Sequence, residues 1–221
     1  MERKTKYANY NYEKEDEQLV NELDNYLEDN ALKIYDFFKI KVQDKIVDIN
    51  IIPTKEEYDE IAKRIRGVDS IPKWSIGFSH DDKIEYLSLR DYKSTSHAFD
   101  DSRYDEMLDY YKKTIVHEYV HYVAALHING KGLDRPARYL NEGIAIYLSG
   151  QKDNQNLSFD YSLEDIEAKN NTYDAWYIIT KHILEEYGKD YFFKLFNDRD
   201  LALKELPKIY EEVKRHYTKR R

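Results

Sequence analysis

The stretch TIVHEYVHYVAAL, residues 114–126, is the centre of the predicted fold. Its apolar residues fall on more than one side of a helical projection, which predicts a buried central α-helix. On such a helix His117 and His121 share a face, with Cβ atoms about 6 Å apart, and can bind one metal ion. Glu118 projects beside them, where a carboxylate can accept a proton from an attacking water. The spacing therefore predicts a catalytic metal site whose third ligand comes from another part of the chain.

The composition limits both the class of protein and the kind of metal site. The chain has 221 residues, so we expect one domain, 1–221, with a part that ends in the metal-binding helix (1–127) and a helical part (128–221). Its 22 tyrosines and 8 phenylalanines supply large side chains to the core. The net charge of −8 argues against non-specific nucleic-acid binding, which needs a surplus of Lys and Arg. Because the chain contains no cysteine, His and carboxylate side chains have to hold the metal.

The N-terminal region gives no sign of export or membrane insertion. It leads into polar residues, and no apolar segment of signal-peptide or transmembrane length follows. We therefore expect a cytoplasmic protein if the chain is complete. A secreted protein without its export signal would have the same sequence features.

Hydrophobic periodicity predicts the elements that precede the metal-binding helix. Apolar residues at helical spacing predict a long amphipathic helix over about 15–38. Residues 47–51 alternate between apolar and polar side chains, which predicts a β-strand. Thr54 and Glu57 then have the capping-box spacing of a helix that ends at Gly67.

A predicted β-hairpin follows, with strands at 74–78 and 84–89. Gly77 interrupts the first of these strands. Two explanations remain open for it: a β-bulge, or the close approach of a substrate backbone to the sheet edge. A polar stretch, 91–101, then leads to the metal-binding helix, with Ser102 or a neighbouring Asp as its N-cap.

Three residues compete to be the third metal ligand. His127 lies six residues after His121, but Ala124 stands where a glycine would be needed to turn the chain back to the metal. The helix should instead continue and carry His127 away from His117. Asp134 lies in a segment that is typical of a loop. Glu142 lies in a predicted apolar helix, where a lone carboxylate needs a partner, and the small residues nearby would let that helix pack on the metal-binding helix.

The pattern His117-Glu118-x-x-His121 followed by Asn141-Glu142-Gly143 resembles the gluzincin metallopeptidases. This group contains thermolysin-like enzymes and zinc aminopeptidases, and the resemblance is greatest to aminopeptidase-like, peptidase MA-like catalytic domains. It implies an α+β fold, with a small mixed sheet whose edge strand lies over the zinc-binding helix, followed by a mostly helical C-terminal part. It also implies a zinc ion (Zn²⁺) on His117, His121 and Glu142, with Glu118 as general base.

The resemblance implies further residues of the active site. Tyr173 matches the tyrosine that stabilises the oxyanion, and Tyr177 is an alternative one helical turn later. The strand from Trp74 to Phe78 matches the edge strand that binds an extended peptide or protein substrate. No carboxylate that would orient either zinc-binding histidine is evident in the sequence.

We therefore predict a zinc-dependent peptidase in which Glu118 is the general base, with endopeptidase action favoured. The alternative is a zinc-stabilised peptide-binding or interaction protein with this fold and little or no catalysis. Two C-terminal helices are expected at 190–197 and 200–217 as part of the helical subdomain, and Pro207 is a potential break in the second.

Overall fold

The computed structural model describes residues 1–42, 46–95, 104–167 and 172–218. The chain divides into two compact units, Met1–Val123 and Ala124–Arg221. The boundary lies inside one long helix, α4 (Tyr104–Lys131).

The first unit contains a five-stranded mixed sheet with the order β1-β2-β3-β5-β4. Its strands are β1 (Glu2–Lys4), β2 (Ala8–Asn11), β3 (Val47–Ile52), β4 (Gly77–His80) and β5 (Lys83–Leu87). The central strands β2, β3 and β5 are parallel, and the edge strands β1 and β4 are antiparallel to their neighbours. A small mixed sheet combined with many helices confirms the expected α+β class.

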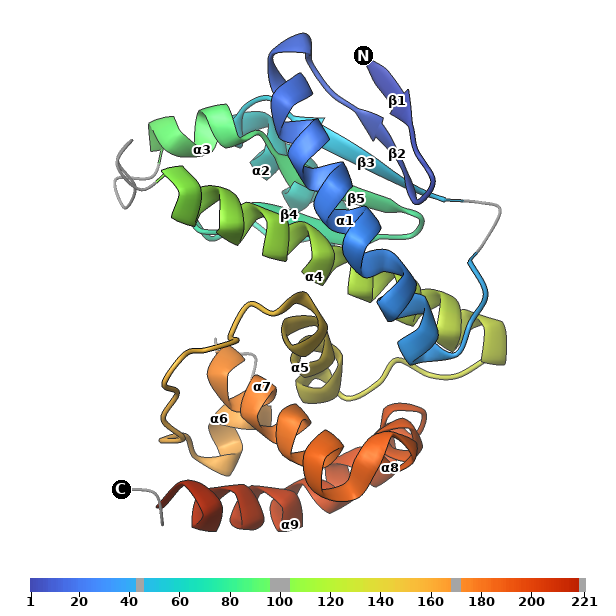
Figure 1. The fold of residues 1–221 in the computed structure, drawn as a ribbon. Helices are drawn as coiled ribbons and strands as arrows, with labels where there is room; N and C mark the ends of the chain where they lie inside the picture. Colours follow the sequence, from blue (N-terminus) through green and yellow to red (C-terminus); the bar gives the residue numbers. More distant parts are fainter. Residues whose placement is uncertain (43–45, 96–103, 168–171, 219–221) are drawn as a thin grey trace. The chain divides into compact units, whose positions relative to one another are not determined.

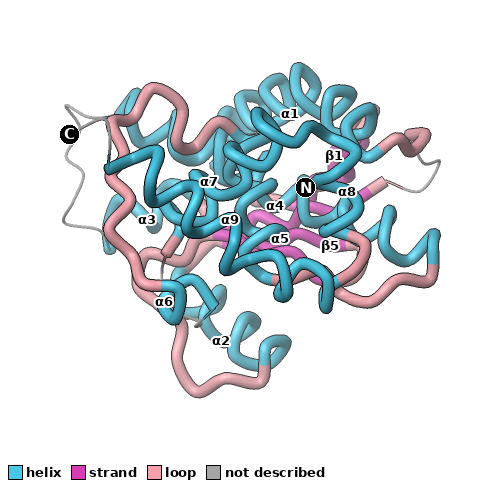
Figure 2. Tube along the Cα trace, turned by 90° about the horizontal axis from the view of Figure 1, so that it is seen from below, coloured by secondary structure: helices cyan, strands magenta, loops and turns pink. Residues whose placement is uncertain are grey.

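Helices cover both faces of this sheet. They are α1 (Glu17–Phe38), which follows a 3-10 turn (Lys14–Asp16), then α2 (Lys55–Arg66), α3 (Leu89–Thr95) and the first part of α4. In Figure 1 and Figure 2, α1 and α4 lie on one face and α2 on the other. Side chains agree with this arrangement: the Tyr86 hydroxyl donates to the Tyr111 carbonyl of α4, whereas Phe78 packs on Tyr58 of α2.

Several predictions from periodicity are confirmed. The long helix, the strand at 47–51 and the next helix form as α1, β3 and α2. The apolar positions of α1 that have helical spacing are all buried. At the start of α2, Thr54 accepts a hydrogen bond from the Glu57 backbone N–H at 3.2 Å, as the capping-box spacing predicted. Gly67 ends the helix with a φ of 65°, which is strained for residues with a Cβ.

The hairpin forms, but its first strand is shorter than predicted, and its second strand ends at Leu87 instead of residue 89 because α3 begins at Leu89. β4 begins at Gly77 because a turn precedes it, in which the Ser75 backbone N–H donates to the Pro72 carbonyl at 3.0 Å. Trp74 lies in this turn and is 46% exposed. The prediction of an edge strand over Trp74–Phe78 is therefore wrong for its first three residues. At Gly77 the register with β5 continues without a β-bulge.

Three elements of the first unit were not predicted, namely β1, β2 and α3. Both strands are short: β1 consists of charged residues and β2 contains two Asn, so their apolar pattern is weak. Helix α3 forms where a polar connection was expected. The proposed N-cap Ser102 lies outside the described residues.

Within its described part, the second unit contains helices joined by loops and no strand. After the end of α4 come α5 (Arg138–Ser149), α6 (Leu163–Glu167), α7 (Tyr173–His182), a π-helical turn η3 (Ile183–Tyr187), α8 (Gly188–Phe196) and α9 (Arg199–Thr218). The two C-terminal helices were predicted, but the suggested break at Pro207 is wrong, because α9 continues through it. Leu206, Ile209 and Val213 are fully buried on one face of α9 and stabilise the helix despite the lost backbone hydrogen bond.

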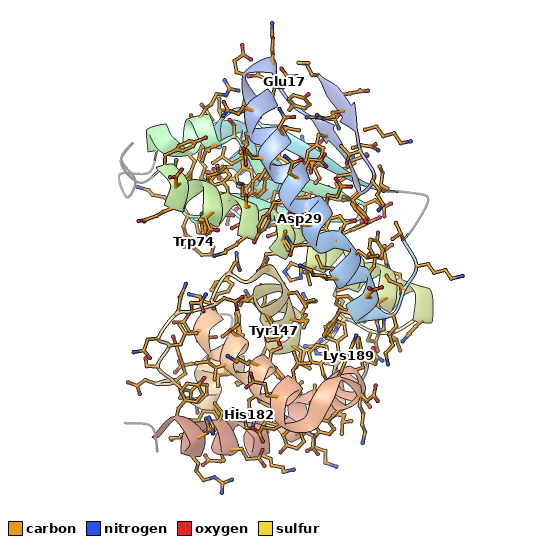
Figure 3. The ribbon with its side chains drawn as sticks, viewed as in Figure 1. Glu17, Asp29, Trp74, Tyr147, His182 and Lys189 are labelled. Carbon is orange, nitrogen blue, oxygen red and sulfur yellow. The ribbon has the colours of Figure 1, made fainter. Side chains whose placement is uncertain are left out.

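Helices α5 and α7 pack closely because α5 contains a glycine at the contact. A Cβ added to Gly143 would lie 2.0 Å from Thr180 Oγ1 and 2.5 Å from the Trp176 carbonyl oxygen, both on α7. Gly143 therefore permits the approach of α7, whereas the sequence had suggested an approach to the metal-binding helix. At the other end of α7, His182 points towards α9, with its Nε2 3.6 Å from Glu212 Oε2 (Figure 3).

Within the described residues, no helix has both the length and the apolar character needed to cross a membrane.

Candidate metal centre

Helix α4 places the two histidines of the predicted site side by side. It is unbroken from Tyr104 to Lys131, so His117 and His121 are one helical turn apart on the same face. Their Nε2 atoms are 3.1 Å apart, and the ring planes are nearly perpendicular, at 85°. Two nitrogen ligands of a tetrahedral zinc ion, each about 2.0–2.1 Å from the metal, are about 3.3 Å apart. The pair therefore has the spacing that one shared metal ion requires.

Glu142 supplies a carboxylate to the same group. It lies on α5 and is half-buried, and one ligand atom from each of His117, His121 and Glu142 lies within 4.8 Å of the others. Among the described residues, this is the one group of at least three His, Cys, Asp or Glu side chains that could hold a metal ion. The structure thus brings together the three ligands expected from the sequence.

The two competing ligands lie in different surroundings. His127 is 2% exposed, and its Nε2 is 2.9 Å from Asn197 Oδ1. The helix continues past Ala124, so His127 lies about 9 Å along the axis from His121. Asp134 is exposed in the loop after α4. Neither belongs to the group that could hold a metal ion.

Glu118 is buried beside the edge strand of the first unit. It is 8% exposed, and its Cγ would be 3.3 Å from a Cβ placed on Gly77, the first residue of β4. The ring of Tyr86 lies against the same glycine. The carboxylate of the expected general base is therefore held next to the end of a sheet-edge strand.

Three buried tyrosines lie near enough to this carboxylate for its charge to affect them. Burial is the main cause that raises the pKa of Tyr58, Tyr86 and Tyr110, and the charge of Glu118 raises the pKa of each further. For Tyr110 the pKa rises to about 12. All three hydroxyls are therefore neutral at physiological pH. The sequence did not reveal this cluster, because Tyr58 and Tyr86 are distant from Glu118 along the chain.

The outer edge of β4 offers backbone hydrogen bonds to a ligand. Within the described part of the chain, β5 is the only strand that pairs with β4. The Ile76 carbonyl accepts a hydrogen bond from the Leu87 backbone N–H at 2.8 Å. The backbone groups of Ile76 and of every second residue after it therefore point towards β5. Because antiparallel backbone groups alternate in direction, the N–H and C=O groups of Gly77 and Ser79 face outwards. An extended peptide could pair with these two residues.

The two candidates for the oxyanion donor lie on α7. Tyr173 is its first residue, and its ring contacts Trp176 edge to face with centroids 5.2 Å apart. The Tyr177 hydroxyl donates to Asp153 Oδ1 at 3.4 Å. Burial, followed by the charge of Asp153, raises the Tyr177 pKa to about 12. The Tyr177 hydroxyl is therefore hydrogen-bonded to Asp153. The role of Tyr173 as oxyanion donor stays a prediction.

No family model, curated protein or solved structure matches this chain.

Proposed function

We propose that the protein is a zinc-dependent peptidase whose metal is held by His117, His121 and Glu142. The observation that carries this proposal is the proximity of one ligand atom from each of these residues, all within 4.8 Å, with Glu118 one position after the first histidine. Two imidazoles and one carboxylate suit zinc and leave a fourth coordination position open, as in catalytic zinc sites. When bound, zinc would act as a Lewis acid and lower the pKa of a water from about 15.7 to about 7.

The residues of the chain have distinct roles in this proposal. Glu118 accepts the proton of the attacking water and later donates it to the leaving amine. Gly77 and Ser79 bind the substrate backbone at the outer edge of β4, which favours an extended peptide. Tyr173 is proposed as the oxyanion donor. A substrate strand paired with β4 would run past the buried Glu118 carboxylate, which supports endopeptidase action.

The first experiment tests Glu118. An E118Q variant keeps the size of the side chain but cannot accept a proton, so we expect full zinc content and a loss of peptide hydrolysis of about 10²–10⁴-fold or more. Zinc is measured by mass spectrometry of metals, and turnover with a diverse peptide library. Equal turnover by E118Q and wild type would contradict the mechanism. If the zinc-loaded wild type binds extended peptides but cleaves none, the protein is a peptide-binding protein instead.

The second experiment tests the ligand set. An E142Q variant should bind zinc at least about 10-fold more weakly, because an amide is a poorer ligand than a carboxylate. D134N is the matched control, since Asp134 is exposed and lies outside the metal-binding group. Zinc affinity is measured by competition with a chelator. Weaker binding in D134N, with E142Q unchanged, would refute the assignment.

A further inference from the structure

The backbone of Gly77 does not require a glycine, as is also true of Gly130 and Gly143 in their helices. Positive φ values, which favour glycine, occur at Gly67, Gly132, Gly150 and Gly188, but not at Gly77. An alanine could adopt the backbone conformation of Gly77 without strain. The reason for a glycine there is therefore space rather than φ.

The missing side chain leaves room for two buried groups. A Cβ on Gly77 would lie 2.7 and 2.8 Å from Cδ2 and Cε2 of Tyr86, and 3.3 Å from Cγ of Glu118. The first two distances are shorter than van der Waals contact, and the third is tight. Any larger residue at this position would have to displace the Tyr86 ring, the Glu118 side chain or β4 itself.

The Tyr86 ring has little freedom to move away. It has no exposed surface, its hydroxyl donates to the Tyr111 carbonyl at 2.6 Å, and its ring contacts the Tyr111 ring edge to face at 5.3 Å. Buried rings in a close-packed core transmit strain instead of absorbing it. A Cβ at position 77 would therefore displace the Glu118 side chain or β4.

We infer that Gly77 is a positioning residue, which sets the distance between the carboxylate of Glu118 and the outer edge of β4. The inference rests on the proposed function, in which the substrate backbone binds at the outer edge of β4. A side chain at position 77 would increase the distance between the Glu118 carboxylate and the peptide bond that is hydrolysed. Misplacement of a reacting group by about 1 Å can cost about 10²-fold in rate.

The test compares Gly77→Ala with Gly130→Ala. Gly130 is exposed in α4, and a Cβ there would meet no atom within 4 Å, so the control introduces the same methyl group without a contact. For G77A we expect zinc content equal to wild type, kcat lower by about 10²-fold, and KM within about threefold of wild type. G130A should match wild type in all three. An unchanged kcat in zinc-loaded, folded G77A would overturn the inference.

A second background tests whether the rigid Tyr86 ring causes the displacement. Tyr86→Leu removes the two ring carbons that a Cβ on Gly77 would meet, but leaves Glu118 in place. Relative to Y86L alone, the G77A/Y86L double variant should therefore lose less stability than G77A loses relative to wild type, and its kcat should be close to that of Y86L, because the ring that forces Glu118 or β4 to move is gone. A kcat as far below that of Y86L as G77A is below wild type would show that the loss does not come from this displacement and would overturn the inference.

A third readout does not depend on catalysis. The carbon-13 signal of the Glu118 carboxylate, identified by its absence from E118Q, should shift in G77A and remain in place in G130A. If wild type cleaves no peptide, the proposed function fails, but this signal still tests whether Gly77 positions Glu118. If wild type is active and the signal does not shift in G77A, the positioning role fails while the proposed function stands.

Discussion

Asp16 is a buried residue whose hydrogen bonds connect two segments of the first unit that are far apart in the sequence. It is 1% exposed, and its carboxylate accepts hydrogen bonds from Ser88 Oγ at 2.6 Å and from Arg90 Nε and Nη2 at 3.0 and 2.8 Å. The hydrogen bonds that Arg90 donates to Asp16, followed by the one that it donates to Glu13, raise the Arg90 pKa. The ion pair connects the start of α1 to the segment after β5.

The two members of this pair should differ in their effect on stability. Arg90→Met leaves the carboxylate of Asp16 buried without its counter-charge, so we expect a loss of about 3–5 kcal/mol in the free energy of unfolding. Asp16→Asn leaves a guanidinium that is 43% exposed and can be hydrated, so the expected loss is smaller, about 1.5–3 kcal/mol. Urea denaturation measures both. Glu13→Gln, which removes the exposed partner of the same Arg90, should cost no more than about 1 kcal/mol, and a loss equal to that of R90M would contradict this account.

Residues of the candidate site differ in how far local sequence predicts them. The proximity of His117 and His121, with Glu118 beside them, follows from helix periodicity alone, because residues four positions apart share one face of a helix. The partners of Asp16 lie 72 and 74 residues away, and nothing near Asp16 in the sequence marks it as buried. The same holds for Tyr58 and Tyr86, whose pKa values the charge of Glu118 raises. Side chains that pack through long-range contacts cannot be identified from a local pattern.

At the scale of elements, the contact between α5 and α7 depends on Gly143. Alanine would gain up to about 1 kcal/mol in helix propensity, but its Cβ would clash with Thr180 Oγ1 and the Trp176 carbonyl oxygen. Such overpacking costs about 1–3 kcal/mol or more, and Thr180 is fully buried, so we expect Gly143→Ala to destabilise the protein. Because Gly143 follows Glu142, zinc affinity should fall as well. Gly130→Ala, without contacts, should be neutral or stabilising, and thermal unfolding with zinc titration compares the two variants.

Elements were predictable where they carry their own apolar periodicity. Helix α1 and strand β3 have it, and both formed at the expected positions. The edge strand was predicted from Trp74, Ile76 and Phe78, but the turn closed by Ser75 and Pro72 shortens it to Gly77–His80. In α9, the buried face outweighs Pro207. Local signals thus failed where a turn or tertiary packing changed the outcome.

For the whole molecule, the sequence led to the α+β class and a helical C-terminal part, which the structure has. The sequence also predicts a single domain whose first part ends at residue 127, and the compact units meet at Val123 and Ala124 of the same helix. An unbroken helix carries no sequence signal for a boundary inside it. Such a boundary depends on which residues the helix contacts, and those contacts are long-range.

Removal of the metal should lower the stability of the whole chain. A ligand that binds the folded state alone stabilises it by RT ln(1 + [L]/Kd), which is about 4 kcal/mol at 1,000 times Kd. For a chain of 221 residues, 1 kcal/mol corresponds to about 2–4 °C, so zinc should raise Tm by about 8–16 °C over chelator-treated protein. The shift should shrink in E142Q and persist in D134N. An equal Tm with zinc and with chelator would mean that His117, His121 and Glu142 do not hold the ion in the folded state.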